Sequence, residues 1–197
     1  SIDCSTEEGS LFVKAKNKTF SKILQSDKSN NDLLMKQILD FFIEKNVKFE
    51  DLTYIFVNQG PGNFSGLRGS LAIAKGVSIS KNINLFGYNT FLWSCAKFFN
   101  KQDKIYSLIK FNNKYFIKEF EKNLKNSFKE KEITEEEIIK KYHDKLITIP
   151  KNFVKYFDKK VLKLKNVNIS DLNHNDLEFL QIKGLLDQEL IKPLYLS

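Results

Sequence analysis

The chain has 197 residues, of which 42% are hydrophobic and 28% are charged, and its formal net charge is +8. This composition is typical of a globular protein with its own core and excludes an intrinsically disordered chain. No apolar run approaches the roughly 20 residues of a membrane-spanning helix, and no signal-peptide pattern opens the sequence. We therefore expect a cytoplasmic protein.

The positive charge is concentrated in one part of the chain. Residues 97–165 carry 19 lysines and 10 acidic residues, whereas residues 1–96 carry 11 basic and 9 acidic ones. One interpretation is compositional, since a lysine-rich chain with much Asn, Phe and Ile is typical of an AT-rich genome. The other is a basic surface that faces a polyanion such as RNA.

The cysteines and histidines do not form a metal-binding pattern. Cys4 and Cys95 lie in apolar segments, so we expect buried free thiols, which suits a reducing compartment. His143 and His174 are far from both cysteines in the sequence, and no zinc-ligand spacing results.

In chain order, the N-terminus predicts a three-stranded antiparallel meander. Its strands are expected over 2–6, 10–16 and 19–25, with a tight turn at Asn17. Asp3, at the end of the first strand, has two interpretations. Its carboxylate can hold a metal or orient a nucleophile, or it can accept N–H groups of the following turn.

A helix is predicted over 31–45, with Asn30 or Asn31 as its N-cap. Its apolar residues cover well over half of the circumference, more than one stripe against a sheet requires. Such a helix lies deep in a core, or it is buried on two sides, by its own sheet and by another protein.

Residues 52–57 predict a central parallel strand. A glycine turn follows, and then a helix over 64–80 that is rich in Gly, Ser and Ala. Each glycine costs a helix about 1 kcal/mol relative to alanine. This cost is reasonable where another backbone approaches closely.

The second half repeats the strand and helix pattern more loosely. A hairpin is predicted across Asn112 and Asn113, and a capping box of Thr134 and Glu137 predicts a helix. The remaining elements are strands over 83–86, 104–110, 114–120, 146–149 and 161–164, helices over 89–99, 134–142 and 171–187, and an edge strand or extended tail over 193–196.

The glycine turn itself gives only the spacing G-x-G-x-x-x-G, from Gly60, Gly62 and Gly66. No Gly-Lys-Ser/Thr follows as in a Walker loop, and no ribose-binding acid follows the next strand. We interpret the turn mainly as one that packs a helix closely on a sheet. Arg68 lies in this stretch and is the one arginine among the 32 basic residues, which suggests a specific contact.

Residues 58–68 read NQGPGNFSGLR, and AKG and GYNT follow at 74–76 and 87–90. This stretch resembles the TsaB (YeaZ) family, whose pattern is a GPGSFTGLR loop, a small-residue helix that ends AKGL, and a G-V-S strand exit. The opening IDCST is similar to the family's IDTST, and the final PLYL to its P-x-Y-L.

The resemblance implies an α/β, two-lobed actin-like fold of the sugar kinase, Hsp70 and actin superfamily. We expect an RNase H-like lobe over 1–100, with a mixed sheet flanked by helices, that serves dimerisation. A smaller α/β lobe is expected over 101–197, with the chain end packing back on the first lobe.

The resemblance also implies a non-catalytic subunit of the machinery that makes N6-threonylcarbamoyladenosine (t6A). This modification lies at position 37 of tRNAs reading codons that begin with A. Its expected partners are a TsaD-type transferase paralogue and a TsaE-type ATPase, with tRNA bound indirectly; a homodimer of the isolated chain stays open. We expect no cofactor of its own, since ATP or ADP and metal belong to the partners. TsaD enzymes hold a metal through a His-x-x-x-His helix, where this chain has Asn30 and Leu34.

The implied partner interface lies on the helices at 31–45 and 64–80. Its expected residues are Leu34, Ile38, Phe41, Phe42, Arg68, Leu71, Ala72, Lys75 and Gly76. The motif loop comprises Gly60, Pro61, Gly62, Phe64, Ser65 and Gly66. Residues 110–113 depart from the family, which often has an Asp-Ala-Arg-Arg hairpin there.

Two other functions stay open. A stand-alone actin-like nucleotide-binding transferase or kinase would bind ATP by itself, although the sequence offers Asp3 without a second paired carboxylate. A peptidase activity would need a metal site or a nucleophile–base pair, and neither histidine lies in a motif of that kind.

Overall fold

The computed structural model describes residues 1–15, 18–25, 31–124 and 129–196. The chain forms two compact units. The first consists of Ser1–Asn89 together with the chain end from Leu186 onward, and the second is Thr90–Leu185. In the described part of the chain, no helix is long and apolar enough to cross a membrane.

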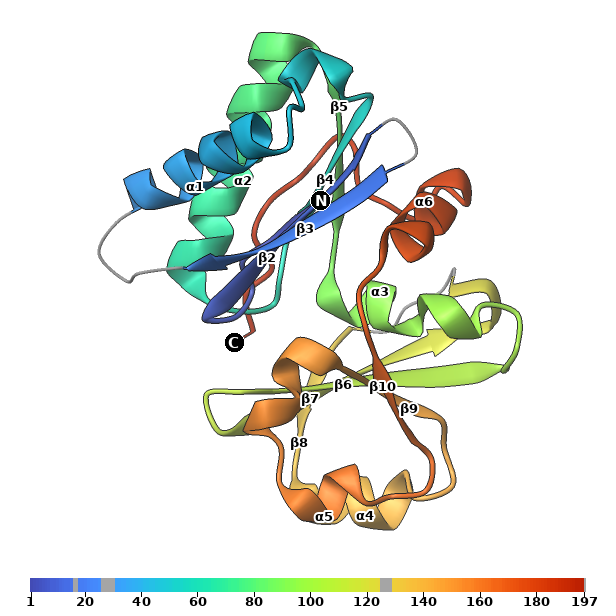
Figure 1. The fold of residues 1–197 in the computed structure, drawn as a ribbon. Helices are drawn as coiled ribbons and strands as arrows, with labels where there is room; N and C mark the ends of the chain where they lie inside the picture. Colours follow the sequence, from blue (N-terminus) through green and yellow to red (C-terminus); the bar gives the residue numbers. More distant parts are fainter. Residues whose placement is uncertain (16–17, 26–30, 125–128, 197) are drawn as a thin grey trace. The chain divides into compact units, whose positions relative to one another are not determined.

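The first unit is built on a five-stranded mixed sheet in the order β3-β2-β1-β4-β5 (Figure 1). β1 is antiparallel to β2 and parallel to β4, and β5 is parallel to β4. The strands are β1 (Ile2–Asp3), β2 (Glu8–Ala15), β3 (Lys18–Gln25), β4 (Tyr54–Asn58) and β5 (Asn84–Tyr88). The predicted meander and the central parallel strand are confirmed; Asn17 and Asn30 lie outside the described residues.

Two helices pack on this sheet, α1 (Asn31–Glu44) and α2 (Phe64–Lys81). Figure 1 shows α1 and α2 side by side, and their apolar residues enter one cluster with the sheet. A 3-10 turn η1 (Phe49–Asp51) lies between α1 and β4. α2 ends at Asn82, whose φ of 52° is left-handed, as asparagine tolerates at a helix end.

The second unit has its own five-stranded sheet, in the order β10-β9-β6-β7-β8. Its strands are β6 (Lys104–Phe111), β7 (Lys114–Glu121), β8 (Lys131–Ile133), β9 (Ile147–Pro150) and β10 (Val167–Ser170). β6 is antiparallel to β7 and parallel to β9, so it occupies the place that β1 has in the first sheet. The two sheets therefore share one topology, more regular than the loose repeat expected from the sequence.

The helical segments of the second unit are mostly short. They are α3 (Thr90–Cys95), η2 (Ala96–Phe98), η3 (Lys122–Leu124), α4 (Glu135–Lys141), η4 (Lys151–Tyr156), α5 (Lys159–Leu162) and α6 (His174–Ile182). In α3, Trp93 is buried, and the Ser94 hydroxyl lies 2.7 Å from that of Ser107 on β6. This contact fixes α3 to its sheet.

Two expectations for this unit are wrong. The segment 161–164 is not a strand, because Val161 belongs to α5 and buries a single apolar side chain there. The strand follows at β10, whose Ile169 is half exposed. The helix expected over 171–187 is shorter, because Asn173 caps α6 and Gly184 ends it with φ of 66°.

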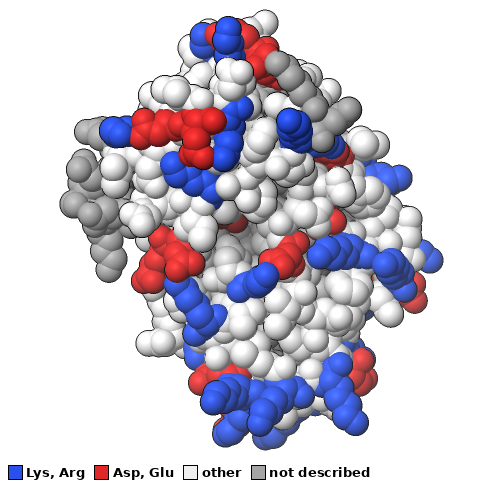
Figure 2. All heavy atoms as spheres, in the orientation of Figure 1, with Lys and Arg blue, Asp and Glu red and all other residues white. Residues whose placement is uncertain are grey.

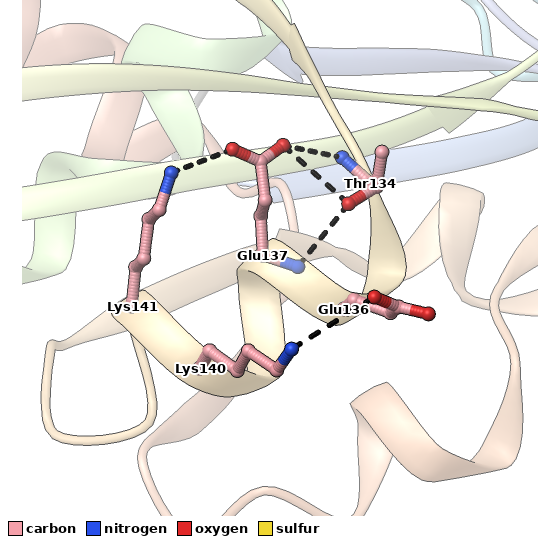
Figure 3. Close-up of polar contacts among 5 residues, drawn as sticks. All are labelled: Thr134, Glu136, Glu137, Lys140 and Lys141. Carbon is pink, nitrogen blue, oxygen red and sulfur yellow. Dashed lines mark hydrogen bonds and ion pairs between the residues drawn. The ribbon is translucent and has the colours of Figure 1, made fainter.

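The local signals of the sequence are reproduced. Asn112 and Asn113 have φ of 50° and 62°, as a two-residue hairpin turn between β6 and β7 requires. Thr134 accepts the Glu137 N–H at 3.2 Å, and the Glu137 carboxylate accepts the Thr134 N–H in return (Figure 3). This reciprocal pair is the predicted capping box of α4.

Candidate functional site

The glycine loop lies directly against the end of β1. A Cβ added to Gly62 would collide with the Ser5 backbone, and one added to Gly66 would collide with the Cys4 carbonyl. The Asn63 N–H donates to the Ser5 carbonyl at 2.7 Å. The loop is thus a close backbone-to-backbone contact, which agrees with the packing interpretation of its glycines.

The chain itself uses the N–H groups at the start of α2. The Asn63 side chain accepts from the N–H groups of Ser65 and Gly66, at 3.1 and 3.4 Å. Two residues before Gly60, the Asn58 side chain accepts the Gly60 N–H at 2.8 Å. Asn63 and Asn58 thereby take the donors that a phosphate loop would direct at its ligand.

Asp3 is buried at the carboxyl end of β1. Its carboxylate accepts the Ser5 N–H at 2.9 Å, as expected of a turn cap. Burial raises the pKa of the Asp3 carboxyl above its ordinary value, and hydrogen bonds from Ser5 and Asn58 partly oppose that rise. Burial also raises the pKa of the Tyr88 phenol, and the negative charge of an ionised Asp3 raises it further.

Asp3→Asn is expected to make the chain more stable at pH 7. A buried acid whose pKa is raised in the folded chain contributes to stability at pH values below its ordinary pKa of 3.8. This contribution is lost as the pH rises through the raised pKa, so Asp3 costs stability at pH 7. Because asparagine cannot ionise, the advantage should shrink as the pH falls toward 4. Urea unfolding of both proteins at the two pH values measures this. Asp40→Asn, at an exposed position of α1, controls for the loss of one carboxylate. Equal stabilities of Asp3→Asn and the parent at pH 7 would contradict the prediction.

The chain end is part of the first unit. Asp187 and Gly87 exchange two backbone hydrogen bonds of 2.8 and 2.9 Å, and the Leu194 N–H donates to the Gln59 carbonyl at 2.6 Å. Between them Ile191 is buried in the core of that unit. The chain end therefore joins β5 to the residue before the glycine loop.

The same segment contributes to a stack of side chains at the start of α2. The Tyr195 ring stacks on Phe64 with centroids 5.2 Å apart, and the Arg68 guanidinium lies 4.4 Å from the centroid of the Phe64 ring. In Figure 1 the red chain end terminates beside the first turn of α2. The stack fixes a planar cation at the surface of the unit.

An outer face of α2 continues from this stack along the helix. It consists of Phe64, Arg68, Ala72, Lys75, Gly76 and Ile79, all exposed. On the neighbouring α1, Leu39 and Ile43 are exposed too, and Ile43 keeps 79% of its surface accessible. We call these eight residues the α1–α2 surface; it is apolar apart from Arg68 and Lys75.

The remaining residues of the expected interface lie elsewhere. Leu34, Ile38, Phe41, Phe42 and Leu71 are buried in the core of the first unit, because they face its sheet. This removes them from the candidate surface. Leu39, Ile43 and Ile79 take their place, which the helical periodicity alone did not distinguish. In the motif loop, Gly60, Pro61, Gly62 and Gly66 are buried, Ser65 is half-buried and Phe64 is exposed.

Both cysteines are buried free thiols, as expected. Burial is the main reason that the pKa of each thiol rises to about 12, so neither is a reactive thiolate at neutral pH. Within the ranges that the structure describes, no three His, Cys, Asp or Glu side chains gather in a group that could hold a metal.

Comparison with known proteins agrees with the motif. A family model described as TsaD, tRNA N6-adenosine threonylcarbamoyltransferase, matches residues 25–109. The tRNA threonylcarbamoyladenosine biosynthesis protein TsaB of Buchnera aphidicola subsp. Schizaphis graminum is 29% identical over 113 residues, 57% of this chain and 54% of that protein. TsaB of B. aphidicola subsp. Acyrthosiphon pisum is 24% identical over 98% of this chain and 88% of its own length.

The chain is therefore similar to TsaB (YeaZ) proteins along its whole length. It spans about half the length of two of the TsaB proteins that it matches, 54% and 52%. Two solved structures share its fold at 15% sequence identity. One is YeaZ from Pseudomonas aeruginosa, with a TM-score of 0.67 over 99% of this chain and 97% of that one.

The other is a protein with similarity to peptidase YeaZ from the same organism, with a TM-score of 0.69 over 100% of this chain and 97% of that one. These likenesses cover both units and agree with the two sheets described above. The fold is therefore the α/β fold of these YeaZ structures, with two five-stranded mixed sheets.

Proposed function

We propose that the chain is a non-catalytic subunit of the machinery that makes t6A in tRNA. Its place would be beside a TsaD-type transferase, with a TsaE-type ATPase, acting on position 37 of tRNAs that read codons beginning with A. The names of its TsaB relatives support the pathway. Since the chain spans only part of two of those relatives, its activity in the pathway is a proposal.

The observation that carries this proposal is the α1–α2 surface. Leu39, Ile43 and Ile79 expose large apolar side chains on two helices that pack side by side. Large exposed apolar side chains on neighbouring helices are typical of protein–protein contacts. Gly76 has open space around an added Cβ, so its missing side chain serves nothing within the chain. It suits the close approach of a second helix from outside.

A paralogue is the partner that this surface fits. The TsaD model matches residues 25–109, which contain all of α1 and α2. A protein with the same pair of helices can present them to this pair around an approximate two-fold axis, as in isologous dimers. The four helices would then bury the exposed apolar side chains on both sides.

The environment of Asp3 favours a non-catalytic role. Its carboxylate is buried and takes up the N–H of Ser5, and the glycine loop closes on the same turn through Gly62. A catalytic carboxylate has to meet its substrate or metal, which this packing prevents. The alternative, a stand-alone actin-like transferase or kinase, requires ATP binding by the isolated chain, and calorimetry with ATP and Mg²⁺ distinguishes the two.

Reconstitution tests the proposal directly. Transferase, ATPase and tRNA are combined with and without this chain, and modified adenosine is scored by mass spectrometry of nucleosides. We expect modification to require the chain, and the chain to elute with the transferase on size exclusion. Full modification in its absence, with two separate monomers on the column, would refute the proposal.

Arg68→Ala and Gly76→Leu are expected to weaken binding of the transferase about tenfold each, without unfolding the chain. The first removes the cation of the aromatic stack, and the second fills the space that a partner helix would occupy. Binding is measured by titration calorimetry and folding by circular dichroism. Lys101→Ala, which removes one exposed cation from the second unit, is the control. Parent-like affinity of both variants would exclude this surface.

A further inference from the structure

A pocket on the second unit has no part in the function proposed above. Its volume is about 350 Å³, within the range of small-molecule sites. It is lined by Tyr106, Ile117, Glu119, Lys129, Lys131 and Tyr142. All six belong to the second unit, and the α1–α2 surface belongs to the first. An experiment can therefore refute the proposal for the pocket without touching the proposed function, and the reverse.

Strand register explains why these side chains meet. Tyr106 on β6 lies opposite Glu119 on β7, and Ile117 lies opposite Lys131 on β8. Ile117 and Glu119 are two residues apart on β7, so both point to one side of that strand. Lys129 lies two residues before Lys131, the first residue of β8, and lines the same pocket. One face of the β6-β7-β8 half of the sheet therefore carries Tyr106, Ile117, Glu119 and Lys131, and Lys129 joins them from the segment before β8.

Two tyrosine rings form adjoining walls of the pocket. Tyr106 and Tyr142 have centroids 5.0 Å apart and planes 74° apart, so the edge of one ring meets the face of the other. Tyr106 is buried and Tyr142, just after α4, is half-buried. Ile117 is buried among them. These are the flat, apolar surfaces on which an aromatic base stacks.

The acidic and basic residues at 129–132 lie on opposite sides of the chain. Glu130 pairs with Lys118 at 3.3 Å and Glu132 pairs with Lys114 at 2.8 Å, on the face opposite the pocket. Lys129 and Lys131 alternate with these two acids and so lie on the pocket side. Among the described residues, neither lysine forms an ion pair.

The negative charge of Glu119, the one acidic residue of the pocket lining, is paired with Lys104. Glu119 accepts a hydrogen bond from Lys104 at 2.6 Å. Burial, and then the charge of Glu119, raise the pKa of the Tyr106 phenol, so this ring stays a neutral hydrogen-bond donor. The pocket therefore presents two tyrosine rings beside two lysines that have no ion-pair partner in the described part of the chain.

We propose that this pocket binds a nucleotide, with its base against Tyr106 and Tyr142 and its phosphate on Lys129 and Lys131. The rings supply stacking, which tolerates any base, and the lysines supply the charge for phosphate. The nucleotide comes either from a single-stranded RNA segment or from a free mononucleotide.

The full chain is titrated with a labelled short single-stranded oligoribonucleotide, and binding is followed by fluorescence anisotropy at several salt concentrations. Tyr142→Leu keeps the apolar bulk but removes the aromatic face, and we expect binding to weaken about tenfold. The double variant Lys129→Gln/Lys131→Gln should lower the slope of log K against log salt by about 1.4. AMP as competitor identifies the source, since displacement of the RNA by AMP indicates a mononucleotide site and its failure indicates an RNA strand.

Lys159→Gln/Lys160→Gln is the matched control, because it removes the same charge from α5, over which Figure 2 shows other lysines gathered. It should leave binding near the parent value. Equal weakening by both lysine pairs, full displacement of the RNA by polyphosphate, or parent-like binding by Tyr142→Leu would each overturn the proposal. Circular dichroism checks that every variant is folded.

Discussion

Gly62→Ala is expected to destabilise the first unit by about 3 kcal/mol. An added Cβ would overlap the Ser5 backbone, and a backbone cannot rotate away as a flexible side chain does. Relieving the overlap means moving the loop off β1, which would also break the 2.7 Å bond between Asn63 and Ser5. Any attachment of α2 that depends on the loop would loosen with it.

The measurement has to separate the two units. Trp93 is the one tryptophan of the chain and lies in the second unit, so its fluorescence reports on that unit alone. Amide hydrogen exchange of β1 and α2 reports on the first unit. We expect protection to fall in β1 and α2 while the Trp93 signal is kept.

Gly76→Ala is the matched control. It makes the same Gly→Ala change at a position within α2, where an added Cβ meets nothing within 4 Å. Alanine is a better helix former than glycine by about 1 kcal/mol, so this variant should be more stable than the parent. If Gly62→Ala were tolerated equally well, the close contact between the loop and β1 would be refuted.

Removal of the chain end after Leu185 is expected to cost the first unit about 4 kcal/mol or more. It would expose the site that Ile191 fills, at about 2–3 kcal/mol, and it would remove three backbone hydrogen bonds of about 1 kcal/mol or less each. Those are the two between Asp187 and Gly87 and the one from Leu194 to Gln59. Domains have about 5–15 kcal/mol in all, so the first unit would be marginal.

A pair of single substitutions tests the same contact in a folded protein. Ile191→Ala should cost about 3 kcal/mol because Ile191 is 5% exposed in the core. Leu190→Ala should change stability by less than about 0.5 kcal/mol, since Leu190 is 66% exposed. Both are measured by urea unfolding followed by hydrogen exchange. Equal effects of the two substitutions would contradict the docking of the chain end.

The sequence predicted most of the secondary structure where neighbouring residues decide it. Thr134 and Glu137 form their capping box within one helical turn, and Asn112 and Asn113 adopt the left-handed backbone of a hairpin turn by themselves. The strand expected over 161–164 failed for the opposite reason. Val161 is apolar, but its burial comes from the packing of α5, and the strand of that region includes the exposed Ile169.

The candidate surface was predicted only in part. The apolar excess of α1 was evident, but periodicity could not divide eight apolar residues into those that face the sheet and those that face outward. The structure assigns Phe41 and Phe42 to the core and leaves Ile43 exposed. The tyrosine–lysine pocket had no signal in the sequence, because Tyr106, Ile117 and Lys131 meet only through strand register.

By itself, the sequence determined most of the strands and helices of the first unit, the glycine loop and the family motif, since each depends on residues close together in the chain. The tertiary structure decided which partner each of these meets. Gly62 needs its small size because of Ser5, 57 residues earlier, and Gln59 is held by Leu194, 135 residues later. Contacts at such separations depend on how the sheet brings strand ends together, and no local pattern encodes them.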